Sequence, residues 1–101
     1  MHTTEKVELT STLAAAITKL VDSYIDTLGK DSVQNLLALT LETIEPIVLQ
    51  EVLEYARYNQ SKAAKYLGLS RTTLRTRLAR YFGDAYAGKR SKEAKERARD
   101  D

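Results

Sequence analysis

The stretch 59-NQSKAAKYLGLSRTTLRTRLARYF-82 decides the fold of this chain. Asn59 is a favourable N-cap for a helix that ends at residue 66 or 67, and Ser70 is one for a second helix that ends near residue 81. Gly68 lies between the two helices, where a tight turn needs a residue that can take a positive φ. The stretch therefore predicts two short helices joined by a tight turn.

Apolar residues on both predicted helices suit a shared core. Ala64 is small enough to let the helices cross closely, and Gly68 follows it by four residues. This Ala-x-x-x-Gly spacing, with apolar residues on either side of the turn, is typical of a helix-turn-helix unit. The residues that we expect to face one another across the turn are Ala63, Ala64, Leu67, Leu74 and Leu78.

Basic charge is concentrated in the same part of the chain. Residues 1–56 hold nine acidic and three basic side chains, whereas residues 57–90 hold nine basic side chains and a single acidic one, Asp84. The last eleven residues hold four of each. A basic block beside an acidic one indicates a surface for a polyanion such as nucleic acid. The alternative is a solvated basic face that binds nothing.

The outward face of the second short helix is suited to DNA. With Leu74 and Leu78 turned inward, this face holds arginine, threonine and a small alanine but no glutamate, and Arg77 lies at its flank. Arginine can donate two hydrogen bonds to a guanine edge, and threonine can contact a phosphate or a thymine methyl group. The pattern predicts a recognition helix whose outward residues are Arg71, Thr72, Arg75, Thr76, Ala79 and Arg80.

Two longer helices are predicted before this unit. Between Thr10 and Leu28 the apolar residues recur at helical spacing and form one stripe. Ser11 or Thr12 can cap the start of this helix, and Gly29 suits its end. The second long helix is predicted over residues 33–57, with Asp31 or Ser32 as its N-cap.

The second long helix predicts a homodimer. Its apolar residues wrap more than one face, so the helix must be surrounded, and a second copy of the chain is the economical way to surround it. We expect a kink at Pro46, because proline removes a backbone hydrogen bond. The alternative is two separate helices over 33–45 and 47–57. The expected interface residues are Leu37, Leu41, Ile44, Val48, Leu49 and Val52.

Several classes of function have no support in the sequence. The chain has no cysteine, its one histidine is His2, and it has no glycine-rich phosphate loop and no carboxylate cluster in the basic half. No apolar stretch approaches the roughly 20 residues of a membrane span, and the N-terminus lacks the pattern of a secretion signal. We therefore expect a cytoplasmic protein that is not an enzyme and has no cofactor, metal, membrane or small-molecule partner.

The segment from about Leu13 to Phe82 resembles the Fis family (factor for inversion stimulation) of bacterial nucleoid-associated proteins that bend DNA. It is also similar to the C-terminal DNA-binding domain of NtrC-type activators. The resemblance is carried by 45-EPIVLQEVLEYARYNQSKAAKYLGLSRTTLRTRLARY-81. It implies an all-α chain of four helices, in which two long dimerising helices precede the helix-turn-helix. It also implies an entwined homodimer that presents two such units to successive major grooves of bent DNA.

The resemblance also assigns contacts with double-stranded DNA. Arg71 and Arg75 are implied to meet base edges. The family's DNA-contacting positions fall here on Asn59, Ser61, Ser70, Arg71, Thr73, Arg75, Thr76 and Arg77, with Arg80 as a flanking candidate. Of these, Asn59, Ser61, Thr73 and Arg77 are assigned to phosphates. Fis proteins commonly have asparagine in place of Ser70 and lysine in place of Thr76 and Ala79, so we expect base preference and affinity to differ there.

The ends of the chain depart from the family. We expect a flexible N-terminus over residues 1–9. The 12 residues before Leu13 are too few for the β-hairpin with which Fis activates DNA invertases, so recombinase stimulation is not expected. Dimerisation helices are expected over 10–57 and the helix-turn-helix unit over 58–82. Residues 83–101 are expected to form a charged, flexible tail.

Together these features predict a homodimeric, sequence-selective DNA-binding and DNA-bending protein. It would act as a transcriptional regulator and associate with the nucleoid. One alternative is the DNA-binding domain of a larger NtrC-type activator, against which the starting methionine and the dimerising half argue. The other alternative is a helical protein–protein adaptor whose basic face meets an acidic partner.

Overall fold

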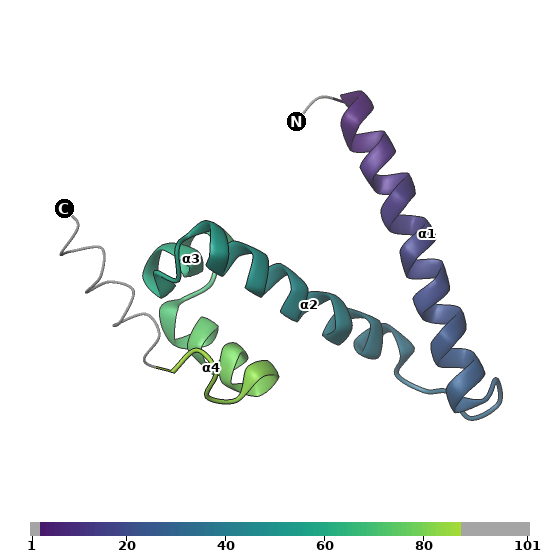
Figure 1. Ribbon diagram of the computed structural model, residues 1–101. Coiled ribbons are helices and arrows are strands. Elements are labelled where there is room, and N and C mark those ends of the chain that lie inside the picture. Colours follow the sequence, from purple (N-terminus) through teal and green to yellow (C-terminus); the bar gives the residue numbers. More distant parts are fainter. Residues whose placement is uncertain (1–2, 88–101) are drawn as a thin grey trace. The chain divides into compact units, whose positions relative to one another are not determined.

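The computed structural model describes residues 3–87, which form four helices and no strand. The helices are α1 (Thr3–Leu28), α2 (Leu36–Tyr55), α3 (Gln60–Leu67) and α4 (Arg71–Phe82), as labelled in Figure 1. The predicted all-α fold with two long helices before two short ones is confirmed. The chain divides into two compact units, Met1–Thr43 and Ile44–Asp101, and the boundary falls within α2.

Helix α1 begins seven residues earlier than the sequence predicts. The two predicted N-cap residues, Ser11 and Thr12, lie inside the helix, and the Thr12 hydroxyl donates to the carbonyl oxygen four residues before it. The predicted end is confirmed, because Gly29 follows the helix with a φ of 89° and its N–H donates to the Ile25 carbonyl. Residues Thr3–Leu9 thus belong to α1 and do not precede it.

The apolar stripe of α1 is only partly covered within the first unit. No residue of this helix is buried; Leu13 and Leu28 at the ends of the stripe are exposed. In its middle, Ile17 and Tyr24 are half-buried, and the Tyr24 hydroxyl is hydrogen-bonded to the Thr43 hydroxyl. A long helix without a buried side chain gains little from tertiary packing within one chain.

Helix α2 starts later than predicted and is continuous. The predicted N-caps, Asp31 and Ser32, lie in a turn, and the helix follows Asn35, whose φ is 55°. This start differs because Gly29 accepts hydrogen bonds from the N–H groups of residues 32 and 33, which closes a turn before the helix. Pro46 lies inside α2, so the alternative of two separate helices is wrong.

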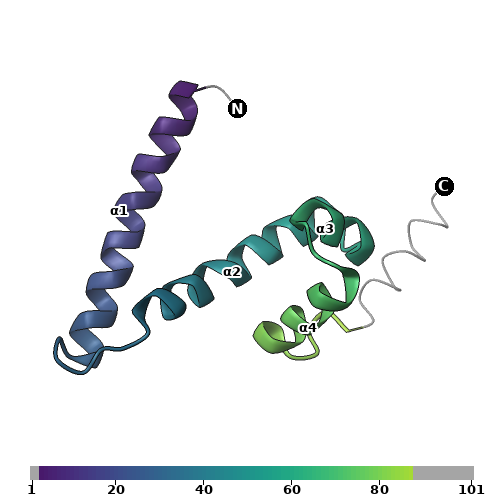
Figure 2. The same ribbon diagram turned by 180° about the vertical axis from the view of Figure 1, so that it is seen from behind.

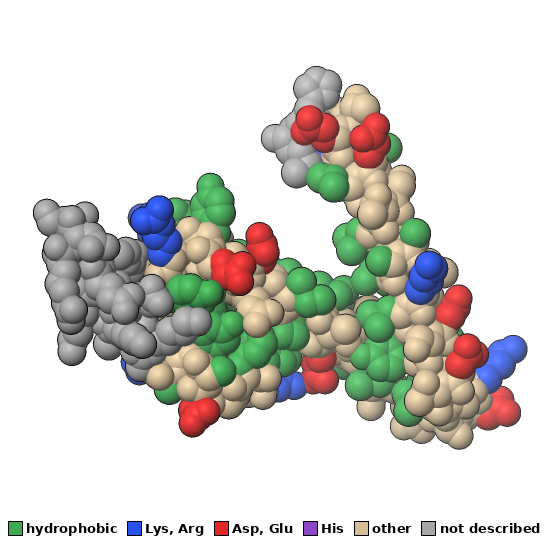
Figure 3. All heavy atoms as spheres, viewed as in Figure 1, with side chains coloured by type: hydrophobic (Ala, Val, Ile, Leu, Met, Phe, Trp, Pro, Cys, Tyr) green, Lys and Arg blue, Asp and Glu red, His purple; other side chains and the backbone are tan. Residues whose placement is uncertain are grey.

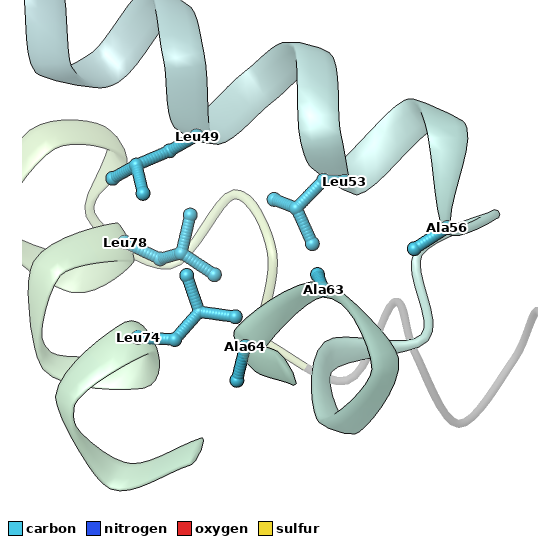
Figure 4. Packing of buried hydrophobic residues seen from close by; sticks show 7 residues of the cluster. All are labelled: Leu49, Leu53, Ala56, Ala63, Ala64, Leu74 and Leu78. Atoms are coloured by element: carbon cyan, nitrogen blue, oxygen red, sulfur yellow. The ribbon is translucent and has the colours of Figure 1, made fainter. Parts of the chain in front are cut away.

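The core of the second unit is built by three helices. Leu49 and Leu53 come from α2, and in both views α3 and α4 lie beside this half of the helix (Figures 1 and 2). The buried side chains point toward one another in Figure 4; they are Leu49, Leu53, Ala56, Ala63, Ala64, Leu74 and Leu78. Burial of each leucine contributes about 1.5–3 kcal/mol, so this small cluster is the main stabilising feature of the unit.

The structure therefore confirms that the apolar residues of the two short helices face one another. A residue predicted for the dimer interface, Leu49, instead lies in this core. Leu49 is 2% exposed in the core of its own chain, and Val52 packs against the same core. Other apolar residues of α2 are open to solvent, since Leu37 and Leu41 are exposed and Val48 is 45% exposed. Apolar side chains along α2 are visible in the space-filling view (Figure 3).

Candidate nucleic-acid interface

The start of α3 is fixed by Asn59, as predicted. Asn59 has extended backbone angles, φ −78° and ψ 101°, and its Oδ1 accepts a hydrogen bond from the Lys62 N–H at 3.1 Å. An N-cap of this kind satisfies one of the backbone donors that a helix start leaves unpaired. Asn59 therefore sets the direction in which α3 leaves the preceding turn.

The turn between α3 and α4 closes at Gly68. Its φ is 72° and its ψ is 28°, which is the left-handed region predicted for this position. The Gly68 N–H donates to the Lys65 carbonyl at 3.2 Å, and the Leu69 N–H donates to the Ala64 carbonyl at 2.9 Å. This pairing of the last helical carbonyls ends α3 cleanly and redirects the chain into α4.

The start of α4 is capped by Ser70, also as predicted. Its Oγ accepts from the Thr73 N–H at 3.0 Å and donates to the Thr73 Oγ1 at 2.9 Å. The two hydroxyls thus hold each other at the N-terminus of α4. The positive end of the helix dipole lies at the same place, which favours a nearby anion such as a phosphate.

The exposed face of α4 matches the face that the sequence predicts. Leu74 and Leu78 are buried, whereas Thr73 and Arg77 are half-buried at its flank. The side chains open to solvent are Arg71, Thr72, Arg75, Thr76, Ala79 and Arg80. No acidic residue occurs between residues 59 and 82, so this face combines hydrogen-bond donors with uniformly positive charge.

The four arginines of α4 differ in their surroundings. Arg77 forms an ion pair with Glu45 of α2, with 2.9 Å between the Nη1 and the Oε1. The Arg80 guanidinium lies over the Tyr81 ring, 5.5 Å from its centroid. Arg71 and Arg75 are exposed and, within residues 3–87, take part in no ion pair or ring contact. On α4, the guanidinium groups of these two arginines are therefore open to solvent without such a contact.

The remaining residues predicted to contact DNA include Ser61 of α3, which belongs to the same helix-turn-helix unit. Ser61 is exposed in the first turn of α3, close to the Asn59 cap. Lys62 and Lys65 are exposed on the same helix, and the Lys62 ammonium lies 5.9 Å from the centroid of the Tyr66 ring. The start of α3 and the outer face of α4 thus both offer donors to a polyanion.

Tyr86 makes several contacts that the sequence does not predict. Its ring stacks on the Tyr58 ring with centroids 6.2 Å apart and meets the Phe82 ring edge-on at 5.2 Å. Gln50 donates to the Tyr86 hydroxyl at 3.1 Å, and the buried Gln60 donates to the Tyr86 carbonyl oxygen at 3.4 Å. We call this group (Tyr58, Phe82 and Tyr86 with the two glutamines) the Tyr86 clasp.

The clasp changes where the folded unit ends. Residues 83–87 form turns that pack on the helix-turn-helix unit through Tyr86, although the sequence predicts a flexible tail from residue 83. The rest of the predicted tail, residues 88–101, lies outside the described residues. The spacing of Phe82 and Tyr86, four residues apart, is the one sequence signal that pointed to a continued apolar face.

Other kinds of site are not seen in the described part of the chain. Residues 3–87 contain no group of three or more histidine, cysteine, aspartate or glutamate side chains that could hold a metal ion. None of the helices in this range is long and apolar enough to span a bilayer.

Helices α3 and α4 are both capped, are joined by a turn that closes at Gly68, and pack on one core. This arrangement, with arginines on the second helix, defines a helix-turn-helix protein. Comparison with known proteins supports this assignment. The family described as "Bacterial regulatory protein, Fis family" matches residues 40–81, which comprise α2 from its fifth residue, all of α3, and α4 up to Tyr81.

Curated relatives narrow the class further. The DNA-binding protein Fis of Buchnera aphidicola subsp. Acyrthosiphon pisum is 33% identical over 78 residues, which cover 77% of this chain and 80% of the relative. That of Pasteurella multocida is 35% identical over 69 residues, 68% of this chain and 70% of the relative. A putative Fis-like DNA-binding protein of Ralstonia nicotianae is 39% identical over 61 residues, 60% of this chain and 79% of the relative. No solved structure matches the chain significantly. The chain belongs to the Fis family.

Proposed function

We propose that this protein is a transcriptional regulator that binds double-stranded DNA by placing α4 in the major groove. The observation that carries the proposal is the outer face of α4, where Arg71 and Arg75 are exposed beside threonines and no acidic side chain occurs. A helix capped by Ser70 and held by Leu74 and Leu78 presents that face as a rigid surface. The curated relatives are named as DNA-binding proteins, which supports the same function.

In the proposed complex the contacts divide into two kinds. Arg71 and Arg75 read base edges, because arginine pairs bidentately with guanine and both side chains point outward. Phosphates meet the N-terminal ends of the two short helices, where the caps orient backbone and hydroxyl donors. The residues proposed for this second role are Asn59, Ser61, Ser70 and Thr73, with Thr76 and Arg80 on the outer face.

We propose further that the protein acts as a homodimer. On a single chain, Leu37 and Leu41 of α2 are exposed, and α1 carries a stripe of apolar residues of which none is buried. Contiguous apolar surface of this kind is costly in water and is normally covered by a partner. A second copy of the chain would cover it and would bring two recognition helices to one DNA. Two such helices engaging neighbouring grooves would favour bent DNA, as a nucleoid-associated regulator requires.

The test is selection of bound fragments from random-sequence DNA, followed by protection of the selected site. We expect an enriched motif with two-fold symmetry, since a symmetric dimer reads two half-sites. The affinity should fall steeply with salt, with a slope of about −0.9 per phosphate contacted. Absence of binding even at low salt would contradict the DNA-binding function, and an asymmetric single half-site would contradict the dimer. Bending is measured separately, from the mobility of permuted fragments.

A further inference from the structure

An ion pair ties the flank of α4 to α2. The Arg77 Nη1 lies 2.9 Å from the Glu45 Oε1, and the two side chains are 42% and 31% exposed. Both residues belong to the second unit, and they are 32 positions apart in the sequence. The pair is neither freely solvated nor buried, so it restrains both side chains without a large desolvation cost.

The family resemblance suggests a different partner for Arg77, namely a DNA phosphate. Arg77 and Thr73 lie one helical turn apart, and both are half-buried at the edge of the exposed face. The guanidinium of Arg77 is directed at a carboxylate of the neighbouring helix. It could meet a phosphate only by leaving Glu45 or by using its remaining donors.

The ion pair joins α4 to α2 in addition to the packing of α4 on the core. Leu74 and Leu78 hold α4 on the core, and Tyr81 and Phe82 pack against the same core. The Arg77–Glu45 ion pair adds a polar attachment of α4 to α2 at the half-buried flank of the helix. Such a tether limits rotation, and rotation of α4 would redirect the exposed Arg71 and Arg75.

We propose that Arg77 is a positioning residue that acts through Glu45, and that a DNA phosphate is not its partner. The ion pair sets the rotation of α4 on α2 and so the direction in which Arg71 and Arg75 point. This inference rests on the proposed DNA binding. If it holds, Glu45 of α2 contributes to the specificity for a preferred DNA site, although it lies outside the helix-turn-helix.

Exchange of the two charges is the decisive experiment. Arg77→Glu and Glu45→Arg should each lower the melting temperature and the affinity for the selected site. The double variant, Arg77→Glu with Glu45→Arg, should restore both toward the wild-type values, because the pair is formed again in reverse. If Arg77 contacted a phosphate, the double variant would bring a carboxylate to the DNA backbone and remain as weak as Arg77→Glu. That result would overturn the inference.

Neutral variants give a second readout. Arg77→Gln and Glu45→Gln should each weaken binding to the selected site by about two- to fivefold, which is the effect of losing a partly exposed ion pair. Binding to random DNA should change less, and the salt slope should stay at the wild-type value. Loss of a phosphate contact would instead reduce the slope by about 0.9. The matched charge controls are Lys19→Gln on α1 and Glu51→Gln on α2, both at exposed positions.

The two proposals fail in different ways. Wild-type protein that binds no DNA would contradict the proposed function. The melting temperatures of the charge-exchange series test the ion pair without DNA, so a double variant no more stable than its single variants overturns the inference whatever the wild type binds.

Discussion

At the scale of single residues, the local geometry of this protein depends on a few positions with left-handed backbone. Gly68 closes the turn of the helix-turn-helix with a φ of 72°. Arg57 and Tyr58 also have positive φ, 54° and 63°, although neither is glycine. Left-handed geometry costs a residue with a side chain roughly 1–2 kcal/mol. The Tyr58 N–H bond to the Leu53 carbonyl at 2.8 Å and the stack on Tyr86 offset part of that cost.

Gly68→Ala should destabilise the protein by about 1 kcal/mol, because alanine resists the left-handed conformation. No atom lies within 4 Å of the position that its Cβ would take, so no steric clash adds to this cost. Gly68→Asn is the matched comparison and should cost less, since asparagine tolerates the same conformation. The measurement is urea unfolding; equal stability of the alanine variant and the wild type would show that the turn is not fixed by Gly68.

Arg75→Ala should weaken binding to the selected DNA site by roughly 1–3 kcal/mol and relax the preference at one base position. The reason is that Arg75 is exposed on the outer face of α4 and within the described residues is held by no ion pair. The fold should be unaffected. Unchanged affinity together with an unchanged site preference would remove Arg75 from the readout.

At the scale of elements, the two short helices are specified locally. Each begins at a residue whose side chain accepts from the backbone N–H three positions later, Asn59 for α3 and Ser70 for α4. Each cap and the N–H group that it accepts from are only three residues apart, so the sequence predicts the starts of both helices well. The start of α1 is predicted less well because its threonines are ambiguous. Thr12, one of the two predicted caps, donates back to the carbonyl four residues earlier, as Thr10 also does, and both residues lie inside the helix.

The Tyr86 clasp is an element-scale feature of which the sequence shows only the four-residue spacing of Phe82 and Tyr86. Tyr86 joins α2 through Gln50, the following turn through Tyr58, and α3 through Gln60. Contacts between positions 26 or more apart leave no periodic signal in the sequence. They depend on where the core places the helices, which becomes known only from the fold.

Tyr86→Ala should destabilise the second unit by about 1–3 kcal/mol, because it removes a half-buried ring that contacts two other rings. Tyr86→Phe keeps the ring and loses the hydrogen bond from Gln50, so it should cost about 1 kcal/mol or less. Thermal unfolding of the two variants checks the order. Wild-type stability of Tyr86→Ala would mean that residues 83–87 contribute nothing to the fold.

At the scale of the whole molecule, α2 contributes some apolar residues to the core of the second unit and exposes others. The sequence does not show which residues belong to which set. Leu49 and Val48 are adjacent apolar residues, and the sequence predicts both in the dimer interface. The structure buries Leu49 in the core of the second unit and leaves Val48 45% exposed. Apolar side chains all around a helix indicate that it is surrounded, but they do not say which neighbour covers which side.

A charge at each of these two positions should therefore have a different effect. Leu49→Asp places a carboxylate in the core and should unfold the second unit. Val48→Asp should leave the helix-turn-helix unit folded and weaken the proposed dimer. Circular dichroism reports the fold and sedimentation reports the mass. A folded monomer in the wild type, or a Val48→Asp variant that sediments as the wild type does, would contradict the proposed interface at this position.

The same helix also limits how the protein can vary. Among the polar side chains of α2, Thr43 is bonded to Tyr24, Glu45 to Arg77 and Gln50 to Tyr86. Glu51 and Glu54 are exposed and stand outside these contacts. Substitutions at Thr43, Glu45 and Gln50 would thus each remove a contact with another part of the chain, whereas those at Glu51 and Glu54 would remove none of the three. Engineered labels or attachment points on this helix are best introduced at Glu51 or Glu54.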